Sequence, residues 1–336
     1  MSSSLIEKIR AAIKKHRMLD RDNSVLVGLS GGADSVALLH ALVHIKQDYN
    51  LKIYIAHIDH MFRGEESKGD MKFCLDLAES MGLTAFCEEK NIPRIAEEKG
   101  ISSEEAARIE RYEFFFRVAR ENSIDKIAVG HTIDDQAETV LMRMIRGSGM
   151  SGLRGMDPVK GMKGMTVIRP LIGVTRREIE DFIRERGIKY RHDSSNDEVV
   201  FTRNKVRHEL IPYLEDRFNP NIKEVLVNMA ENLRAEDDFL DKFSSRKFKI
   251  MSKKNRSGDI SVDIGKFKKQ PAAVRKRIVR SALRELKGDL RRFTYQHWKE
   301  IEELVGARPV NSVVDLPGGI DIKKEKGIIV FKRPKI

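Results

Sequence analysis

The sequence contains few cysteines and no long apolar run. Among 336 residues only Cys74 and Cys87 are cysteines, and their spacing is not that of a CxxC pair. We therefore expect neither a disulfide framework nor a cysteine-bound zinc ion or iron–sulfur cluster. No stretch approaches the roughly twenty apolar residues that cross a bilayer, and the N-terminal segment carries charges throughout, so we expect no membrane span and no signal peptide. These absences favour a protein of the reducing cytoplasm.

Length and charge suggest a two-domain protein with an acidic partner. The hydrophobic fraction of 40% in 336 residues can fill a sizeable core. Lysine and arginine number 63 against 51 aspartate and glutamate residues, which gives a formal net charge of +12. Such an excess suits nucleic acid or another polyanion, although many basic proteins bind neither.

The N-terminal part alternates short apolar runs with longer helical patterns. This alternation predicts an α/β fold with an open parallel sheet and helices on both faces. One predicted helix spans residues 103–121, with Ser102 or Ser103 as its cap. The five expected strands are Ser24–Leu29, Lys52–Ile58, Leu83–Glu89, Asp125–Gly130 and Thr166–Leu171.

The sequence changes character near Tyr213, where Pro212 and Pro220 punctuate a helix and its exit. We place a domain boundary there, between residues 1–213 and 214–336. The second part reads as mainly helical, and residues 312–333 predict a short closing β-hairpin.

The first predicted strand runs directly into the hexapeptide SGGADS, Ser30–Ser35, and then into a helix. Adjacent glycines let backbone N–H groups turn inward, and the following helix adds its positive end, so this turn can hold a phosphate. The pattern is neither GxxxxGK[ST] nor GxGxxG. The alternative is an ordinary strand-to-helix turn capped by Ser30 or Asp34, but the strand before and the helix after both lie where a phosphate site needs them, which favours the phosphate site.

A second polar cluster follows the fourth predicted strand. His131, Asp134, Asp135 and Glu138 lie at the start of a helix, with Asp134 and Glu138 on one face and His131 and Asp135 on another. Carboxylates at this edge of a parallel sheet could hold magnesium or orient an incoming amine. They could also simply complement the helix dipole.

Several basic residues could join these clusters. Arg108 and Arg111 lie one helical turn apart and could bind phosphate, or could form a solvated face. Asp59, His60 and Arg63 follow the second strand, and the glycine-rich segment 146–156 predicts a mobile loop over substrate. Arg203, Lys205 and Arg207 near the boundary could follow an RNA backbone or hold phosphate, or be solvated surface.

These motifs together carry a resemblance. SGGADS resembles the signature of the ATP pyrophosphatase, or PP-loop, superfamily, which has an adenine nucleotide alpha-hydrolase-like fold and cleaves ATP between its α and β phosphates. Together with the segments 57–67, 130–156, 169–196 and 201–212, it is similar to the tRNA(Ile)-lysidine synthetases. The resemblance is dense over residues 20–215 and looser beyond.

The resemblance implies a two-step reaction on a CAU-anticodon tRNA(Ile). The C2 carbonyl oxygen of the wobble cytidine, position 34, would attack the α-phosphate of ATP and release pyrophosphate. The ε-amine of free L-lysine would then attack C2 and release AMP, which leaves lysidine. ATP and Mg²⁺ would be the cofactors, and formation of a homodimer is left open.

The same resemblance implies roles for individual residues, and it leaves the division between Asp134 and Asp135 open. Catalysis would involve Asp34, Asp134, Asp135 and Arg111, and Asp34 and Asp135 would hold the metal. The tRNA would be bound by Arg146, Arg154, Arg203 and Arg207. ATP would be bound by Ser30, Gly31, Gly32, Ala33, Asp34, Ser35, His60, Arg63, Arg108 and His131.

Three alternatives differ in chemistry. A tRNA thiolase of the same superfamily would need catalytic or cluster-binding cysteines, for which Cys74 and Cys87 are poorly placed. A small-molecule amidating enzyme would need a glutamine-hydrolysing domain, for which the sequence has no N-terminal cysteine nucleophile. A basic RNA-binding protein without catalysis would show no pyrophosphate release.

Overall fold

The computed structural model describes residues 3–62, 65–191, 202–288, 290 and 292–333. The chain forms two compact units, residues 1–232 and 233–336, which divide within helix α12 (Ile222–Met251). The boundary predicted near Tyr213 lies before this division. The reason is that Leu226 and Ala230 of α12 pack with Ala137 and Val140 in the first unit.

The first unit is built on one six-stranded sheet with the order β3-β2-β1-β4-β6-β5. The first five strands in this order are parallel, and β5 pairs antiparallel with β6. The predicted parallel sheet is therefore confirmed, with an antiparallel edge strand added. The strands are β1 (Ser24–Gly28), β2 (Lys52–Asp59), β3 (Thr84–Glu89), β4 (Lys126–Ala128), β5 (Val159–Met162) and β6 (Met165–Ile168).

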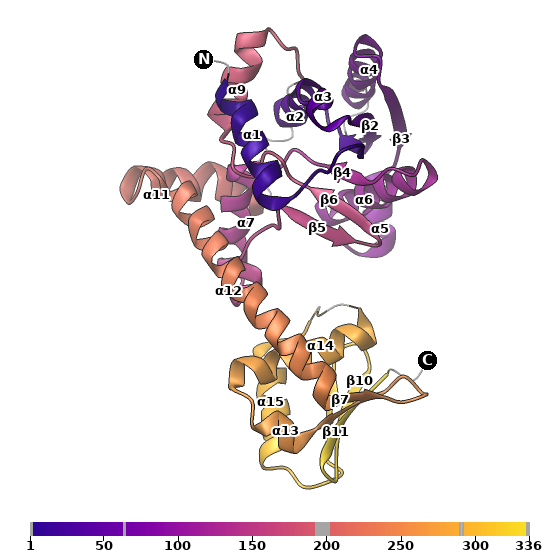
Figure 1. Cartoon of the computed structure of the whole chain (residues 1–336), viewed down its shortest axis with the longest axis vertical. Helices are drawn as coiled ribbons and strands as arrows, with labels where there is room; N and C mark the ends of the chain where they lie inside the picture. The colour runs from indigo at the N-terminus through magenta and orange to yellow at the C-terminus, as the bar shows by residue number, and fades with distance from the viewer. Residues whose placement is uncertain (1–2, 63–64, 192–201, 289, 291, 334–336) are drawn as a thin grey trace. The chain divides into compact units, whose positions relative to one another are not determined.

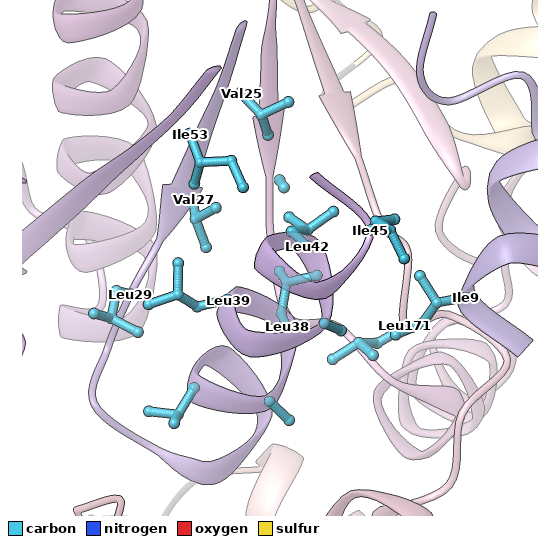
Figure 2. Packing of buried hydrophobic residues seen from close by; sticks show 14 of the residues in the cluster. Ile9, Val25, Val27, Leu29, Leu38, Leu39, Leu42, Ile45, Ile53 and Leu171 are labelled. Atoms are coloured by element: carbon cyan, nitrogen blue, oxygen red, sulfur yellow. The ribbon is translucent and has the colours of Figure 1, made fainter. Parts of the chain in front are cut away.

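Helices cover both faces of this sheet, as Figure 1 shows. On one face α1 (Ser3–His16), α2 (Ala33–His44), α4 (Glu65–Ser80) and α9 (Arg176–Arg186) share an apolar core with the strands. Figure 2 shows Leu38, Leu39 and Leu42 of α2 beside Val25 and Val27 of β1. On the other face lies α6 (Ser103–Glu121), against which α5 (Ile92–Lys99) packs. Burial of these leucines contributes roughly 1.5–3 kcal/mol each and holds α2 against the sheet.

Helix α6 begins where the sequence predicted. Ser102 is its N-cap, and the Ser102 hydroxyl accepts a hydrogen bond from the backbone N–H of Glu105 at 3.2 Å. The other elements of this unit are α3 (Lys46–Tyr49), α7 (Ile133–Ile145), α8 (Met150–Leu153), α10 (Thr202–Lys205), the π-helix η2 (Val206–Leu210) and α11 (Ile211–Arg217).

The second unit contains more β-structure than the sequence predicted. The expected hairpin is present as β10 (Ile320–Glu325) and β11 (Ile328–Lys332), but it belongs to a five-stranded antiparallel sheet with the order β7-β8-β11-β10-β9. The additional strands are β7 (Ser252–Lys254), β8 (Ile260–Asp263) and β9 (Val313–Leu316), and the helices are α13 (Ile264–Lys268), α14 (Ala272–Lys287) and α15 (Tyr295–Gly306).

The core of the second unit joins this sheet to its helices. Ile322 and Phe331 from the hairpin pack with Ile278 of α14 and Trp298 of α15. Among the described helices of either unit, none combines the length and apolarity that a bilayer span requires.

Candidate active site

The candidate site lies where the strand order of the first sheet reverses. Strand β1 pairs with β2 on one side and with β4 on the other. At such a point the connections after the two central strands diverge to opposite faces and leave a crevice at the carboxyl edge, which is where open α/β sheets bind ligands. The segment SGGADS follows β1, and the acidic cluster follows β4, so the two predicted motifs flank this crevice.

Serine hydroxyls fix the phosphate loop at Ser30–Ser35. The Ser35 hydroxyl accepts from the backbone N–H of Ser30 at 3.1 Å and donates to the carbonyl of Gly32 at 2.9 Å. The Ser30 hydroxyl accepts from the backbone N–H of Gly32 at 3.3 Å. The serines therefore stabilise the turn itself, while the start of α2, whose N-cap Gly32 offers no side-chain cap, presents backbone N–H groups and a positive dipole end.

Two glycines in this region are required by geometry. Gly31 has φ +87°, a left-handed conformation that disfavours other residues. Gly130, after β4, lies so close to α2 that a Cβ atom there would be 3.1 Å from the carbonyl carbon of Asp34. A side chain at residue 130 would therefore push the segment after β4 and the start of α2 apart by a few tenths of an ångström.

Asp34 in the first turn of α2 is held by an arginine from α9. Its carboxylate accepts from Nη1 of Arg176 at 2.8 Å and is one-third exposed. Burial raises the pKa of Asp34 to about 6, although Arg176 opposes this shift. Near neutral pH the carboxylate is thus charged and paired with a guanidinium.

The start of α7 directs Asp134 and Asp135 to different partners. Asp135 closes a capping box with Thr132 and also accepts from Nη2 of Arg203 at 2.6 Å. Asp134 instead accepts from the backbone N–H of Arg176 at 3.1 Å and forms an ion pair with Lys223 at 2.9 Å. The sequence did not separate the roles of Asp134 and Asp135, and the structure gives the two carboxylates different partners.

Glu138, one turn further along α7, is the most buried carboxylate of the site. Its side chain is 1% exposed and accepts from Nε of both Arg203 and Arg207 at 2.6 Å. Burial alone would raise the pKa of Asp135, but Arg203, the hydrogen bond from the backbone N–H of Thr132 and Arg207 bring it below its usual range. Arg203 and Arg207, predicted to bind tRNA, thus contact the acidic cluster in this structure.

His131 lies among positive charges. Burial lowers the pKa of His131; Asp135 opposes this, while Arg169, Arg203 and Arg111 add to it. The imidazole is therefore neutral at physiological pH, and its Nδ1 is buried without a hydrogen-bond partner among the described residues. Nη2 of Arg111 lies 3.3 Å from Nε2 of His60, which accepts from it.

The remaining predicted residues differ in exposure and in their contacts. Arg108 is exposed on α6, Arg146 is exposed at the end of α7, and Arg154 forms an ion pair with Asp157 at 2.7 Å. Arg63 lies outside the described residues. The glycine-rich loop is held by Arg143, whose guanidinium donates to the carbonyls of Gly152 and Gly155.

A magnesium ion would find a small protein ligand set here. Among the described residues no group of three or more histidine, cysteine and acidic side chains is arranged to hold a metal ion. Magnesium typically takes one or two carboxylates together with phosphate oxygens and water, a requirement that Asp34 beside a phosphate loop fits. Asp135 fits less well, because both of its oxygens already accept hydrogen bonds.

Comparison with known proteins identifies the family. A family model described as a PP-loop domain matches residues 1–214, and one described as the TilS substrate binding domain matches residues 263–327. The tRNA(Ile)-lysidine synthase of Clostridioides difficile strain 630 is 35% identical over 332 residues, covering 99% of this chain and 71% of that protein. This chain belongs to the tRNA(Ile)-lysidine synthase family. The resemblance inferred from the motifs is thereby confirmed.

A second tRNA(Ile)-lysidine synthase has a similar sequence, and a solved tRNA thiolase has a similar fold. The enzyme of Caldanaerobacter subterraneus subsp. tengcongensis is 37% identical over 331 residues, covering 98% of this chain and 70% of that protein. The U34-tRNA thiolase NcsA from Methanococcus maripaludis, solved with its [4Fe-4S] cluster, superposes with a TM-score of 0.54 at 21% identity, covering 69% of this chain and 79% of that one. This last similarity concerns the fold, which agrees with the predicted fold class.

Three residues of the site were missed from the sequence. Arg176 was hidden in the run of charges that opens α9, although the TRRE pattern at 175–178 marks a capping box and hence a fixed helix start. Arg169 and Lys223 carried no local signal, because only the fold brings them to the crevice.

Proposed function

We propose that this chain uses ATP to join free L-lysine to C2 of the wobble cytidine of a CAU-anticodon tRNA(Ile). The observation that carries the proposal is that a phosphate loop and a buried acidic cluster flank one switch point, in a chain of the lysidine synthase family. The first feature suits the pyrophosphate of ATP, and the second suits an amine.

In the first step the O2 oxygen of cytidine attacks the α-phosphorus. The O2–Pα bond forms, the bond from Pα to the bridging oxygen breaks, and pyrophosphate leaves. The N–H groups at the start of α2 would hold the departing pyrophosphate. Arg111, held against His60, would offset charge developing at the α-phosphate. Mg²⁺ held by Asp34 together with the phosphates would supply further positive charge.

In the second step the lysine Nε attacks C2, and the C2–O2 bond breaks. AMP departs with O2 as a phosphate oxygen, a far better leaving group than a carbonyl oxygen. The ammonium must first lose a proton to become nucleophilic, and a carboxylate can orient the ammonium before that loss. Asp135 and Glu138 would orient the lysine ammonium, because each already binds a cationic side chain that this second cation can replace.

Binding of the tRNA would draw on the net charge of +12. Backbone phosphates attract such a surface, and the affinity should fall steeply with salt. Arg146, which is exposed, is the better candidate for direct phosphate contact, because Arg203 and Arg207 are already paired.

The test is to incubate the protein with ATP, Mg²⁺, lysine and a CAU-anticodon tRNA(Ile), digest the RNA and weigh the wobble nucleoside by mass spectrometry. A lysine-dependent mass gain on cytidine, lost in Asp34→Asn but kept in Asp216→Asn, is expected; Asp216 is 74% exposed and pairs with its neighbour Arg217. Pyrophosphate release without a lysine adduct would point to another nucleophile, such as the sulfur of a thiolase. No turnover would favour a binding protein.

A further inference from the structure

Arg176 connects the phosphate loop to the acidic cluster. Its guanidinium donates from Nη1 to Asp34 at 2.8 Å and from Nε to Glu180 at 2.9 Å. Its backbone N–H donates to Asp134 at 3.1 Å. One residue therefore touches a carboxylate on each side of the switch point.

The backbone at Arg176 is fixed, whereas its side chain can move. Thr175 caps α9 through a capping box with Glu178, and Lys8 holds Glu178 at 2.6 Å. The carbonyl of Val174 accepts from the backbone N–H of Ile133 at 3.0 Å, which ties this segment to α7. The guanidinium itself is nearly half exposed, and Nη2 makes no hydrogen bond with the residues that the structure describes.

We propose that Arg176 binds the β and γ phosphates of ATP and that Asp34 and Glu180 hold it beside the phosphate loop until the nucleotide arrives. The inference rests on the proposed use of ATP. A guanidinium presents parallel donors that match phosphate oxygens, and phosphate offers it more negative charge than a single carboxylate. The anchored helix start keeps the side chain within reach of the positive end of α2.

The neighbouring residue provides a matched control. Arg177 is also an arginine and follows Arg176 directly at the start of α9. Its side chain is 92% exposed, however, and its ion-pair partner Asp181 lies 4.0 Å away. Replacing Arg177 removes the same charge from the same helix end without touching the phosphate loop.

The test measures equilibrium binding of ATP, pyrophosphate and AMP, each with Mg²⁺, by dialysis against the full chain without tRNA. Arg176→Gln should weaken ATP and pyrophosphate binding about tenfold and change AMP binding by less than about twofold, because AMP lacks both phosphates. Arg176→Lys should recover part of the loss, since it keeps the charge without the fork. Arg177→Gln should match the wild type.

The outcomes separate the two proposals. Equal weakening of ATP and AMP would overturn the phosphate contact, since Arg176 would then only position Asp34 or the loop. ATP binding unchanged in both Arg176 variants would also overturn it, while leaving ATP use intact. A wild-type chain that binds neither ATP nor pyrophosphate would overturn the proposed function itself. Thermal melting of each variant excludes loss of folding as the cause.

Discussion

Gly130→Ala tests whether the contact between β4 and α2 sets the geometry for ATP. An added Cβ would lie 3.1 Å from the carbonyl carbon of Asp34 and 3.2 Å from the backbone nitrogen of Ser35. Ordinary contact begins at 3.4 Å, so the two segments must separate by about 0.3 Å. The opposing atoms are backbone and cannot rotate away. Overpacking of this kind costs about 1–3 kcal/mol of unfolding free energy.

The same displacement moves the phosphate-binding N–H groups. If a 1 Å misplacement of a binding group costs about 100-fold in rate, then a 0.3 Å misplacement costs roughly fourfold. We therefore expect kcat/KM for ATP, measured as tRNA-dependent pyrophosphate release, to fall by about fourfold. Gly173→Ala is the control, because a Cβ there meets nothing within 4 Å. Equal kcat/KM values for the two variants, with Gly130→Ala folded, would refute the reasoning and place the ATP phosphates elsewhere.

Further predictions concern buried charges. Arg277→Met should destabilise the second unit by about 2–3 kcal/mol in urea titrations, because Asp237, 4% exposed, loses the charged hydrogen bond that it accepts from Arg277 at 2.5 Å. Glu138→Gln should lower the unfolding free energy by about 2–3 kcal/mol in the same assay. The glutamine amide nitrogen replaces one carboxylate oxygen and cannot accept the hydrogen bond that this oxygen took from an arginine. The cost stays moderate because Arg203 and Arg207 are about one-third exposed. Burial lowers the pKa of His57, so below about pH 6.5 the unfolded chain binds a proton that the folded chain does not. The unfolding free energy of the wild type should therefore fall as the pH is lowered from 7, and it should fall more steeply than that of His57→Gln, by up to about 1.4 kcal/mol per pH unit. Parallel curves of unfolding free energy against pH for the two proteins would contradict this.

Local patterns predicted the framework of the first unit. The run Ser24–Leu29 followed by two glycines and an apolar helix allows few other structures, and it forms β1, the phosphate loop and α2. Strand β5 was missed because its four residues include the exposed Lys160 and Gly161, which give no apolar alternation. Strand β7 was missed for the same reason, since it reads Ser-Lys-Lys.

Pairings across the site were harder to predict than its residues. The acidic cluster was visible because its members lie within eight residues, whereas Arg203 is 65 residues from Glu138 and meets it only after the chain has added β5, β6 and α9. Arg203 therefore looked like a free cation in the sequence. The fold turns it into the partner of a carboxylate that is 1% exposed.

Each acidic group of the site is already paired with a basic one, and this has a consequence for binding. Asp34 pairs with Arg176, Asp134 with Lys223, and the remaining two carboxylates, Asp135 and Glu138, pair with Arg203 and Arg207. Leaving any of these buried charges alone would cost several kcal/mol, so the folded chain without ligands keeps them satisfied. A polyphosphate that attracts the arginines would release carboxylates for cations, and a cation would release arginines for phosphate. Binding of an anionic and a cationic substrate should therefore be mutually favourable, through exchange of ion pairs whose partners are already in the crevice.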